Sequence, residues 1–327
     1  MRCLVFARAL TAHGWKTLFV CRPPSRTTVP GLAAALHELP SDLDLAEEAT
    51  YLRHHLPAPA LLVVDHYGWH ASLEEGCRGW CRRILVVDDT AASRRDADFL
   101  VNPNPGWSEK AYHGLLPRGC RLLLGPRYAF LHPAFRSARA IARPRREVRR
   151  ILVAMGGTDP VDATGEAVAV LAAADFPGTI EVVLGPAAPG LPSLRRRVAG
   201  DPRFHLRVGV TPPEMAELLR RCDLAVAAAG SSSWERCCVG LPSIVSPIVA
   251  NQERAARALE AEGIALVVEG LGRGGGGPGL ASALERLRSD PGLRAQFRER
   301  GRRLVDGRGA ERVTEAVART EAVSHAP

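Results

Sequence analysis

Ala228-Ala-Gly-Ser-Ser-Ser-Trp-Glu-Arg-Cys-Cys-Val-Gly-Leu-Pro-Ser243 is the stretch of sequence that decides the fold. Residues 223–228 predict a short buried strand, Gly230 and the serines predict a turn, and residues 234–239 predict the start of a helix. A strand, a glycine turn and a helix in this order are typical of an α/β domain with a parallel sheet, in which ligands bind at such turns. A capped helix that binds nothing is the alternative.

The polar residues of this stretch form a candidate site for a phosphate and a sugar. Glycine lets the backbone approach a ligand closely, serine hydroxyls can cap the helix and donate to phosphate oxygens, and the helix amides point back at the turn. A carboxylate about one turn into the helix suits the vicinal hydroxyls of a ribose. The candidate binding residues are Gly230, Ser231, Ser232, Ser233 and Glu235.

A second glycine turn follows a predicted strand at residues 150–155. Gly156 and Gly157 allow positive φ and close approach of a diphosphate, Thr158 can donate a hydroxyl hydrogen, and Asp159 can cap the next helix. The turn is neither a Walker loop nor the Gly-x-Gly-x-x-Gly of dinucleotide folds, so a purely structural turn is the alternative.

Two glycine turns at strand ends of one domain favour a nucleotide site over two unrelated structural turns. The side-chain amides of Asn251 and Gln252, at the start of a later helix, can read the hydroxyls of an attached sugar. An exposed polar first turn of a helix is the alternative for this pair.

The length of 327 residues fits two domains of about 150 residues each. We expect these domains at residues 1–136 and 150–327, joined by a basic linker at 137–149 that is dense in arginine. The last helix, which ends at Val323, can also pack back on the first domain. Because no stretch of about 20 apolar residues occurs, we expect no stable membrane insertion and a cytoplasmic protein. The eight cysteines show no paired metal-ligand spacing and predict buried free thiols.

Short apolar strands alternate with helices in the first half and predict a parallel sheet covered on both faces. We expect helices at residues 2–15 and 31–38, and strands at 60–65 and 83–88. The strand at 17–21 and the strand at 60–65 should be neighbours of a further strand between them, because the first strand of a doubly wound sheet usually lies in its middle. Without it, buried amides would stay unpaired at about 1–3 kcal/mol each, so we expect further residues before Met1.

Polar side chains follow two of these strands. Asp65, His66 and Tyr67 follow the first, and Asp88 and Asp89 follow the second, so all project from the edge of the sheet at which ligands bind. They are candidate substrate contacts. An ordinary loop histidine and a solvated turn are the alternatives for His66 and for the aspartate pair.

Six motifs together carry a resemblance to a known family: Asp65-His-Tyr-Gly68, Val87-Asp-Asp89, Leu124-Gly-Pro-Arg-Tyr128, Met155-Gly-Gly-Thr-Asp-Pro160, the segment 229–242 and Asn251-Gln252. Nearly end to end, the chain resembles the UDP-2,4-diacetamido-2,4,6-trideoxy-β-L-altropyranose hydrolases of pseudaminic acid biosynthesis. The resemblance implies an α/β fold with two Rossmann-like doubly wound domains, similar to the glycosyltransferase-B fold of MurG, with an interdomain cleft.

The resemblance also implies an activity. Water would attack the anomeric carbon of a UDP-sugar and release UDP and the free sugar, with no metal and no cofactor. By similarity, Glu235 would bind the ribose, Asn251 and Gln252 the sugar, and the two glycine turns, including Gly156, Gly157, Thr158 and Ser231 to Ser233, the nucleotide and its phosphates.

The chain departs from the family at the proposed base. The family opens with a Gly-x-Gly-His-x-x-Arg loop whose histidine activates water, and Arg2 matches the arginine of that loop, so the histidine would lie before Met1. Asp65 and His66 are the substitutes that we expect. Residues 131–135 also depart from the family's Arg and Glu. We therefore expect the chain as given to be inactive or badly folded, and a version extended upstream to hydrolyse the UDP-sugar.

Three other functions stay open: a glycosyltransferase that uses the same UDP site, a UDP-sugar 2-epimerase, and a UDP-sugar binding protein without turnover. The net charge of +8 is modest, and the aromatic residues, 5% of the chain, are not interleaved with the arginine cluster. We therefore expect a UDP-sugar as the partner and no nucleic acid. No oligomeric state follows from the sequence.

Overall fold

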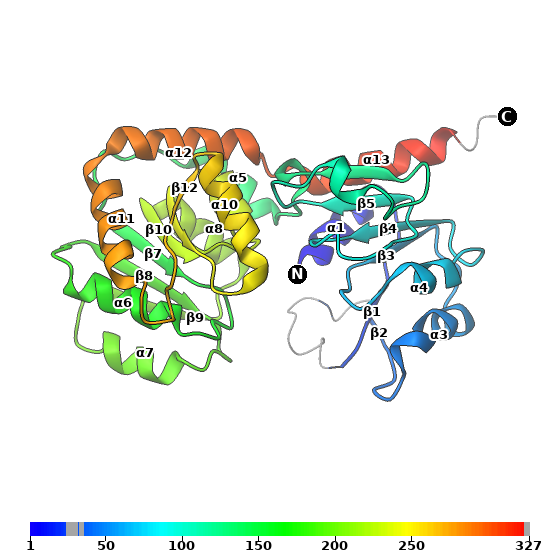
Figure 1. Cartoon of the computed structure of the whole chain (residues 1–327), viewed down its shortest axis with the longest axis horizontal. Helices are drawn as coiled ribbons and strands as arrows, with labels where there is room; N and C mark the ends of the chain where they lie inside the picture. Colours follow the sequence, from blue (N-terminus) through cyan, green and yellow to red (C-terminus); the bar gives the residue numbers. More distant parts are fainter. Residues whose placement is uncertain (24–31, 33–35, 324–327) are drawn as a thin grey trace. The chain divides into compact units, whose positions relative to one another are not determined.

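The computed structural model describes residues 1–23, 32 and 36–323 and divides the chain into two compact units (Figure 1). Unit 1 comprises Met1–Phe130 and Arg308–Pro327, and unit 2 comprises Leu131–Gly307. Unit 1 therefore consists of two separate stretches of chain, whereas unit 2 is continuous.

Unit 2 is an alternation of strands and helices, with one short 3-10 helix labelled η. Its elements are α5 (Pro133–Ile141), β7 (Arg150–Ala154), α6 (Ala163–Ala173), β8 (Thr179–Leu184), α7 (Leu191–Val198), β9 (Phe204–Val208), α8 (Pro212–Arg221), β10 (Leu224–Ala228), α9 (Ser233–Val239), β11 (Ser243–Ser246), η4 (Ala250–Gln252), α10 (Glu253–Ala261), β12 (Ala265–Val267), α11 (Gly277–Ser289) and α12 (Pro291–Leu304).

The strands of unit 2 form one six-stranded parallel sheet in the order β12-β11-β10-β7-β8-β9. From β7 the chain moves outward through β8 to β9, and it then returns to the other side of β7 as β10. The strand order therefore reverses between β7 and β10. In open α/β sheets this reversal is the place where ligands bind, beyond the carboxyl ends of the strands.

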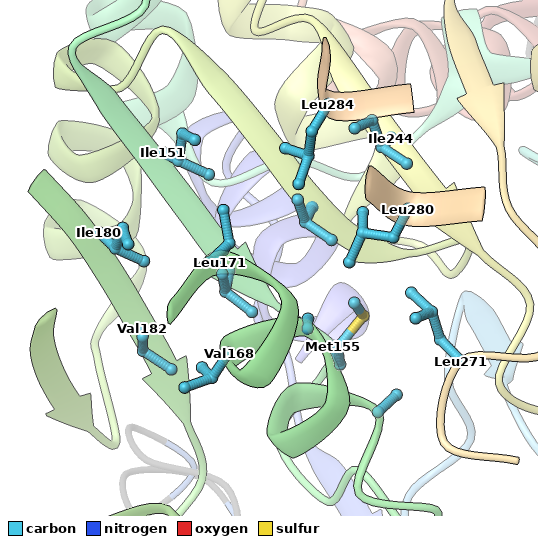
Figure 2. Packing of buried hydrophobic residues seen from close by; sticks show 14 of the residues in the cluster. Ile151, Met155, Val168, Leu171, Ile180, Val182, Ile244, Leu271, Leu280 and Leu284 are labelled. Carbon is cyan, nitrogen blue, oxygen red and sulfur yellow. The ribbon is translucent and has the colours of Figure 1, made fainter. Parts of the chain in front are cut away.

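Helices cover both faces of this sheet. Figure 2 shows Leu171 of α6 and Leu280 and Leu284 of α11 packed with Ile151 of β7 and Ile180 of β8 in one buried cluster. The helices α5, α8, α9 and α12 contact one another in a second group. Because β10 and β11 are buried along their whole length, the strands offer polar chemistry to a ligand only at their ends.

Unit 1 contains a second set of parallel strands. Its elements are α1 (Arg2–Ala12), β1 (Phe19–Cys21), β2 (Leu36–Glu38), η1 (Leu45–Glu47), α3 (Glu48–His55), β3 (Leu61–Val64), α4 (Ala71–Gly76), β4 (Arg83–Val87), β5 (Phe99–Asn102), η2 (Glu109–Tyr112), β6 (Arg121–Leu124), η3 (Pro126–Tyr128) and α13 (Gly309–Val323). The strands form a four-stranded sheet, β3-β4-β5-β6, and a two-stranded sheet, β1-β2.

Each face of the four-stranded sheet has its own apolar cluster. On one face, Phe6 of α1 and Val313 and Val317 of α13 pack with Leu85 of β4 and Phe99 of β5. On the other, side chains of α3 and α4 pack with Ile84 and Val86 of β4 and Val64 of β3. Unit 1 is therefore also an α/β layer structure covered on both sides, as the alternation of strands and helices predicted.

The helix predicted at residues 31–38 is wrong where the structure describes that range. Residues 36–38 form the strand β2, which pairs in parallel with β1 through Phe19 and Leu36. Residues 31 and 33–35 lie outside the described part of the chain. An alanine-rich segment favours a helix locally, but the open edge of β1 offers backbone hydrogen bonds that local propensity does not reveal.

The strands β1 and β3 share no ladder among the described residues. This agrees with the gap predicted between the strands at 17–21 and 60–65. The side chains of β1, and those of β3 apart from Val64, are half-exposed rather than buried, so the edge amides can reach water at a lower cost than the sequence argument assumed.

The compact units differ from the predicted ranges 1–136, 137–149 and 150–327. The helix α13 belongs to unit 1, because Val313 and Val317 are buried against that unit's sheet. The helix α5 occupies the start of the predicted linker and belongs to unit 2, where Phe135 and Ala138 are buried and α5 contacts α8 and α9. Buried side chains in both helices decide these assignments, and the place of α13 agrees with the expectation that the last helix packs back on the first domain.

Replacing Val313 by Ala should lower the free energy of unfolding of unit 1 by about 2 kcal/mol, because the substitution removes two methyl groups from a fully buried site. Denaturant unfolding followed by tryptophan fluorescence measures this, since Trp15, Trp69, Trp80 and Trp107 lie in unit 1 and Trp234 in unit 2. The control Val208→Ala, at a site 38% exposed, should change the free energy by less than about 0.5 kcal/mol. Equal effects of the two substitutions would contradict the packing of α13.

Candidate functional site

Both glycine turns lie at the carboxyl edge of the unit 2 sheet and follow adjacent strands. β7 ends at Ala154, which is paired with Ala227, the next-to-last residue of β10. Gly156 has a φ of +99°, which a side chain rarely adopts, and Gly157 and Thr158 beside it are exposed. The structure therefore brings the two predicted turns together at the point where the strand order reverses.

The Gly156-Gly157 turn packs against the backbone of Gly185 and has free space at the Cβ position of Gly157. A Cβ atom added to Gly185, just after β8, would lie 2.1 Å from the Gly157 carbonyl oxygen, so the two backbones are in direct contact. A Cβ atom added to Gly157 itself would meet no atom within 4 Å. The turn thus offers backbone to an approaching ligand and has a rigid support beneath it.

Asp159 serves α6 instead of facing a ligand. One carboxylate oxygen accepts a hydrogen bond from the Ala163 amide at 3.0 Å, and the other accepts from the Thr164 amide at 2.8 Å. The residue is buried and has a φ of +35°. Both oxygens are therefore engaged in the cap that the sequence also predicted, and little capacity remains for a substrate contact.

The structure places Gln252 beside the second turn. Its Nε2 atom lies 3.4 Å from the position of a Cβ atom on Gly230, and its Oε1 atom accepts from the Ile248 amide at 3.1 Å. One end of the amide is therefore fixed and the other lies over the glycine. Asn251 is exposed next to it. The predicted sugar-reading pair therefore lies beside the predicted phosphate turn.

The side chain of Glu235 is partly buried and remains a candidate for contact with a ligand. Among the described residues, no hydrogen bond or ion pair to its carboxyl group is found, although the side chain is only partly exposed. Burial raises the pKa of this carboxyl group to about 7, against the opposing influence of the neighbouring Arg236 charge. A ligand that donates hydrogen bonds to the carboxylate would replace the lost contact with water.

Arg236 is a residue of the site that the sequence analysis missed. It is 3% exposed and donates to Ser232 Oγ at 3.0 Å, to Ser233 Oγ at 2.9 Å and to the Ala228 carbonyl oxygen at 3.0 Å. A signal was present, because Arg236 stands three and four positions after these serines, and residues at this spacing meet on one helix face.

Unit 1 has its own polar network at the carboxyl ends of β3 and β4. Arg2 donates to both carboxylate oxygens of Asp65, at 2.9 and 2.6 Å, and to Asp89 at 2.9 Å. Burial alone would raise the pKa of Asp65, but the Arg2 hydrogen bonds and charge outweigh it and hold that pKa below its ordinary value. Asn104 also donates to Asp89, at 3.0 Å. Asp65 is therefore a bound anion and a weak base.

The other two candidates of this strand end have different surroundings. His66 Nδ1 accepts from the Gly68 amide at 3.0 Å, so a neutral ring carries its hydrogen on Nε2. Tyr67 is 71% exposed and donates to Asp89 at 2.9 Å, and burial of the hydroxyl together with the Asp89 charge raises its pKa to about 12. The carboxylates of Asp65 and Asp89 therefore both accept hydrogen bonds from neighbouring side chains.

Asp88 has a structural task. Its carboxylate accepts from the Thr90 amide and hydroxyl and from the Ala91 amide, at 2.9 to 3.1 Å, and it is buried. It therefore fixes the loop after β4 and leaves Asp89 as the member of the pair that joins the Arg2 network.

No helix of the described part of the chain is both long and apolar enough to cross a membrane. Across residues 1–23, 32 and 36–323, no group of three or more His, Cys, Asp and Glu side chains is placed to hold a metal ion.

No family model matches the chain. The spore coat polysaccharide biosynthesis protein SpsG of Bacillus subtilis (strain 168) is 36% identical to it over 236 residues, which cover 71% of the chain and 67% of that protein. The UDP-2,4-diacetamido-2,4,6-trideoxy-beta-L-altropyranose hydrolase of Campylobacter jejuni is 24% identical over 229 residues, covering 65% and 74%. The chain is thus more similar to SpsG than to the hydrolase to which its motifs pointed.

Among solved structures, MurG of Acinetobacter baumannii superposes with a TM-score of 0.67 at 13% identity, covering 97% of the chain and 95% of that protein. At this identity the likeness concerns the fold alone. It confirms the predicted fold class, an α/β protein with two Rossmann-like domains of the glycosyltransferase-B type.

Replacing Asp159 by Ala should lower the free energy of unfolding by about 1–2 kcal/mol, because two amides at the start of α6 lose their acceptor. Hydrogen exchange at the Ala163 and Thr164 amides should become faster, while the control Asp175→Ala, at an exposed site of the same unit, should leave both quantities unchanged. Unchanged exchange in the Asp159 variant would show that the cap is dispensable.

Proposed function

The chain belongs to the family of the Bacillus subtilis spore coat polysaccharide biosynthesis protein SpsG, and we propose that it is a nucleotide-sugar enzyme that binds a UDP-sugar in unit 2 and releases UDP by transferring the sugar to water. The observation that carries the proposal is the pair of glycine turns at adjacent strand ends, at the reversal of the strand order, with the partnerless carboxyl group of Glu235 beside them.

Each part of a nucleoside diphosphate finds a matching group. The open backbone of Gly156 and Gly157 suits a diphosphate, because only glycine permits such a close approach. The Glu235 carboxylate suits the two hydroxyls of a ribose, which can both donate to it. The amide of Gln252 over Gly230, and that of Asn251, suit the hydroxyls or acetamido groups of the attached sugar.

The same turns suit the chemistry of cleavage. When the bond between the anomeric carbon and UDP breaks, negative charge grows on the β-phosphate, and donors already fixed in position stabilise that charge without rearranging. The amides of the Gly156 turn and the hydroxyls of Ser231 and Ser232 can donate to this phosphate, and Arg236 holds the Ser232 hydroxyl in position.

Water also needs activation. Of the two predicted bases in unit 1, Asp65 is held as an anion by Arg2, and His66 carries its hydrogen on Nε2 when its ring is neutral. Asp65 is therefore suited to orient a water molecule or a sugar hydroxyl. The assignment of a base stays a prediction.

Two of the similarities bear on whether water or another molecule accepts the sugar. The Campylobacter relative, 74% of whose length is matched, is described as a hydrolase, which favours water. The likeness to MurG extends over nearly the whole chain and keeps a glycosyltransferase as the second candidate. A UDP-linked diacetamido-trideoxy sugar is the substrate that we propose to try first.

The test measures UDP release from this UDP-sugar with water as the sole acceptor. Hydrolysis predicts that UDP and free sugar appear in equal amounts. UDP release that requires an added acceptor sugar would instead identify a transferase. An epimeric UDP-sugar would identify an epimerase, and UDP binding without any product would identify a binding protein.

Replacing Glu235 by Ala should weaken UDP binding by about tenfold or more, because a carboxylate that accepts hydroxyl hydrogens is lost. The affinity of the native chain for uridine should fall as the pH drops from about 8 to about 6. With its raised pKa of about 7, the Glu235 carboxylate becomes protonated in this range and accepts hydrogen bonds less well. Uridine carries no phosphate that titrates there, and the Glu235→Gln variant should show no such pH dependence. Titration by calorimetry or NMR measures both effects. If Glu235→Ala holds UDP as firmly as the native chain does, the UDP site is wrong.

A further inference from the structure

The buried residue Arg236 lacks an ion-pair partner among the residues that the structure describes. Its side chain is 3% exposed, and in the part of the chain that the structure describes, no ion pair joins it to a carboxylate. Its neighbour Glu235 is adjacent in the helix, and adjacent helical residues do not face each other. Burial lowers the pKa of Arg236 to about 10, so the group still carries its charge near neutral pH.

The contacts of the guanidinium are all to neutral oxygens. It donates to Ser232 Oγ, Ser233 Oγ and the carbonyl oxygen at the end of β10, and its Nε atom has no partner among the described residues. A buried cation with neutral partners alone is costly, and one unsatisfied donor adds to that cost.

The cavity beneath the turn offers little room for an anion. This cavity, bordered by Ser233, Arg236 and Ser243, measures about 10 Å³, which is at the lower limit for a single water molecule. The other side of the serines is the more open approach to this charge. Ser232 is part-exposed, whereas Ser233 is buried, so Ser232 is the one that a ligand can reach.

The hydrogen bond from Arg236 also sets the orientation of the Ser232 hydroxyl. Because a guanidinium can only donate, the Ser232 oxygen acts as the acceptor. No protein acceptor for the hydroxyl's own hydrogen is found among the described residues, so this hydrogen is available to a ligand. A hydroxyl that accepts from a cation is also a stronger donor, because hydrogen bonds in a chain polarise one another.

Building on the proposed function, we propose that Arg236 is a positioning residue for the diphosphate: it fixes Ser232 so that the hydroxyl donates to a phosphate oxygen, and the arriving phosphate is the counter-ion that the buried guanidinium lacks. The specificity of the turn for a diphosphate then comes from a residue that never touches the ligand. A purely structural role is the competing explanation, in which Arg236 holds the turn in shape and serves all ligands equally.

The test compares UDP with uridine, which lacks the phosphates. Arg236→Met should weaken UDP binding by about tenfold or more and leave uridine binding within about twofold, because hydrogen bonds to charged groups contribute to the former alone. Arg303→Met, the same substitution at an exposed residue paired with Glu299, should change neither affinity. Equal losses for UDP and uridine would overturn the proposal in favour of the structural role.

A double-mutant cycle tests the coupling between the two residues. Ser232→Ala should reproduce the loss of UDP affinity on its own, and the double variant should lose little more than either single variant, because both act through one hydrogen-bond chain. Additive losses would overturn the proposal. Ser232→Ala also keeps the question testable if Arg236→Met does not fold, because a Ser232→Ala chain that binds UDP as well as the native chain contradicts the relay.

Arg236→Lys should restore part of the UDP selectivity, and more of it at lower pH, because burial lowers the pKa of a lysine and the charge returns on acidification. No recovery at any pH would count against a role for the charge. If the native chain does not bind UDP at all, the proposed function itself is wrong. If the native chain binds UDP but Arg236→Met leaves the ratio of UDP affinity to uridine affinity unchanged, this inference alone is wrong.

Discussion

The reversal of strand order beside β7 is the constraint on which the site in unit 2 depends. Parallel pairing of β7 with both β8 and β10 places the ends of β7 and β10 side by side, and the helices that follow leave toward different parts of the sheet. Because both faces of the sheet are buried under helices, the strand ends are where backbone and polar side chains remain accessible. The glycines at 156 and 230 matter because they stand at these two ends. Gly185, from the end of β8, closes the support beneath the first turn. Geometry that serves the core therefore also creates the binding edge.

Each unit contains an arginine that is buried or part-buried, and the two arginines have different kinds of partner. In unit 1, Arg2 is surrounded by the carboxylates of Asp65 and Asp89, and the network neutralises itself. In unit 2, Arg236 donates its hydrogen bonds to neutral oxygens and forms no ion pair within the described part of the chain. An anionic ligand gains from the second arrangement and not from the first. This contrast is consistent with the proposal of a diphosphate site in unit 2.

Much of the fold followed from local sequence. Apolar runs bounded by glycine, as at 150–155 and 223–228, predicted the strands of unit 2, and Asp159 was correctly interpreted as a cap. What failed required knowledge of distant partners. The segment 36–38 is a strand because β1 offers it hydrogen bonds, and the start of the predicted linker is the helix α5 because Phe135 and Ala138 are buried in unit 2. The packing of the last helix on the first domain, in contrast, agrees with the sequence-based expectation. The candidate site shows the same contrast between local and distant information. The residue type and its position in the helix predicted Glu235 from the sequence. The direction of the Arg236 side chain depends on three acceptors that the helix and strand bring together.

The division of the chain has a consequence for biosynthesis. Unit 2 is a single continuous segment, so its six-stranded sheet can be completed while the remainder of the protein is still being made. Unit 1 begins at Met1 but receives α13 only after Leu131–Gly307 has been synthesised. Until then the face of its sheet around Leu85 and Phe99 has only part of its cover, from α1, and exposes apolar surface. The half that is translated first is therefore the half that matures last, and its unfinished face is the surface that a chaperone would encounter on the nascent chain.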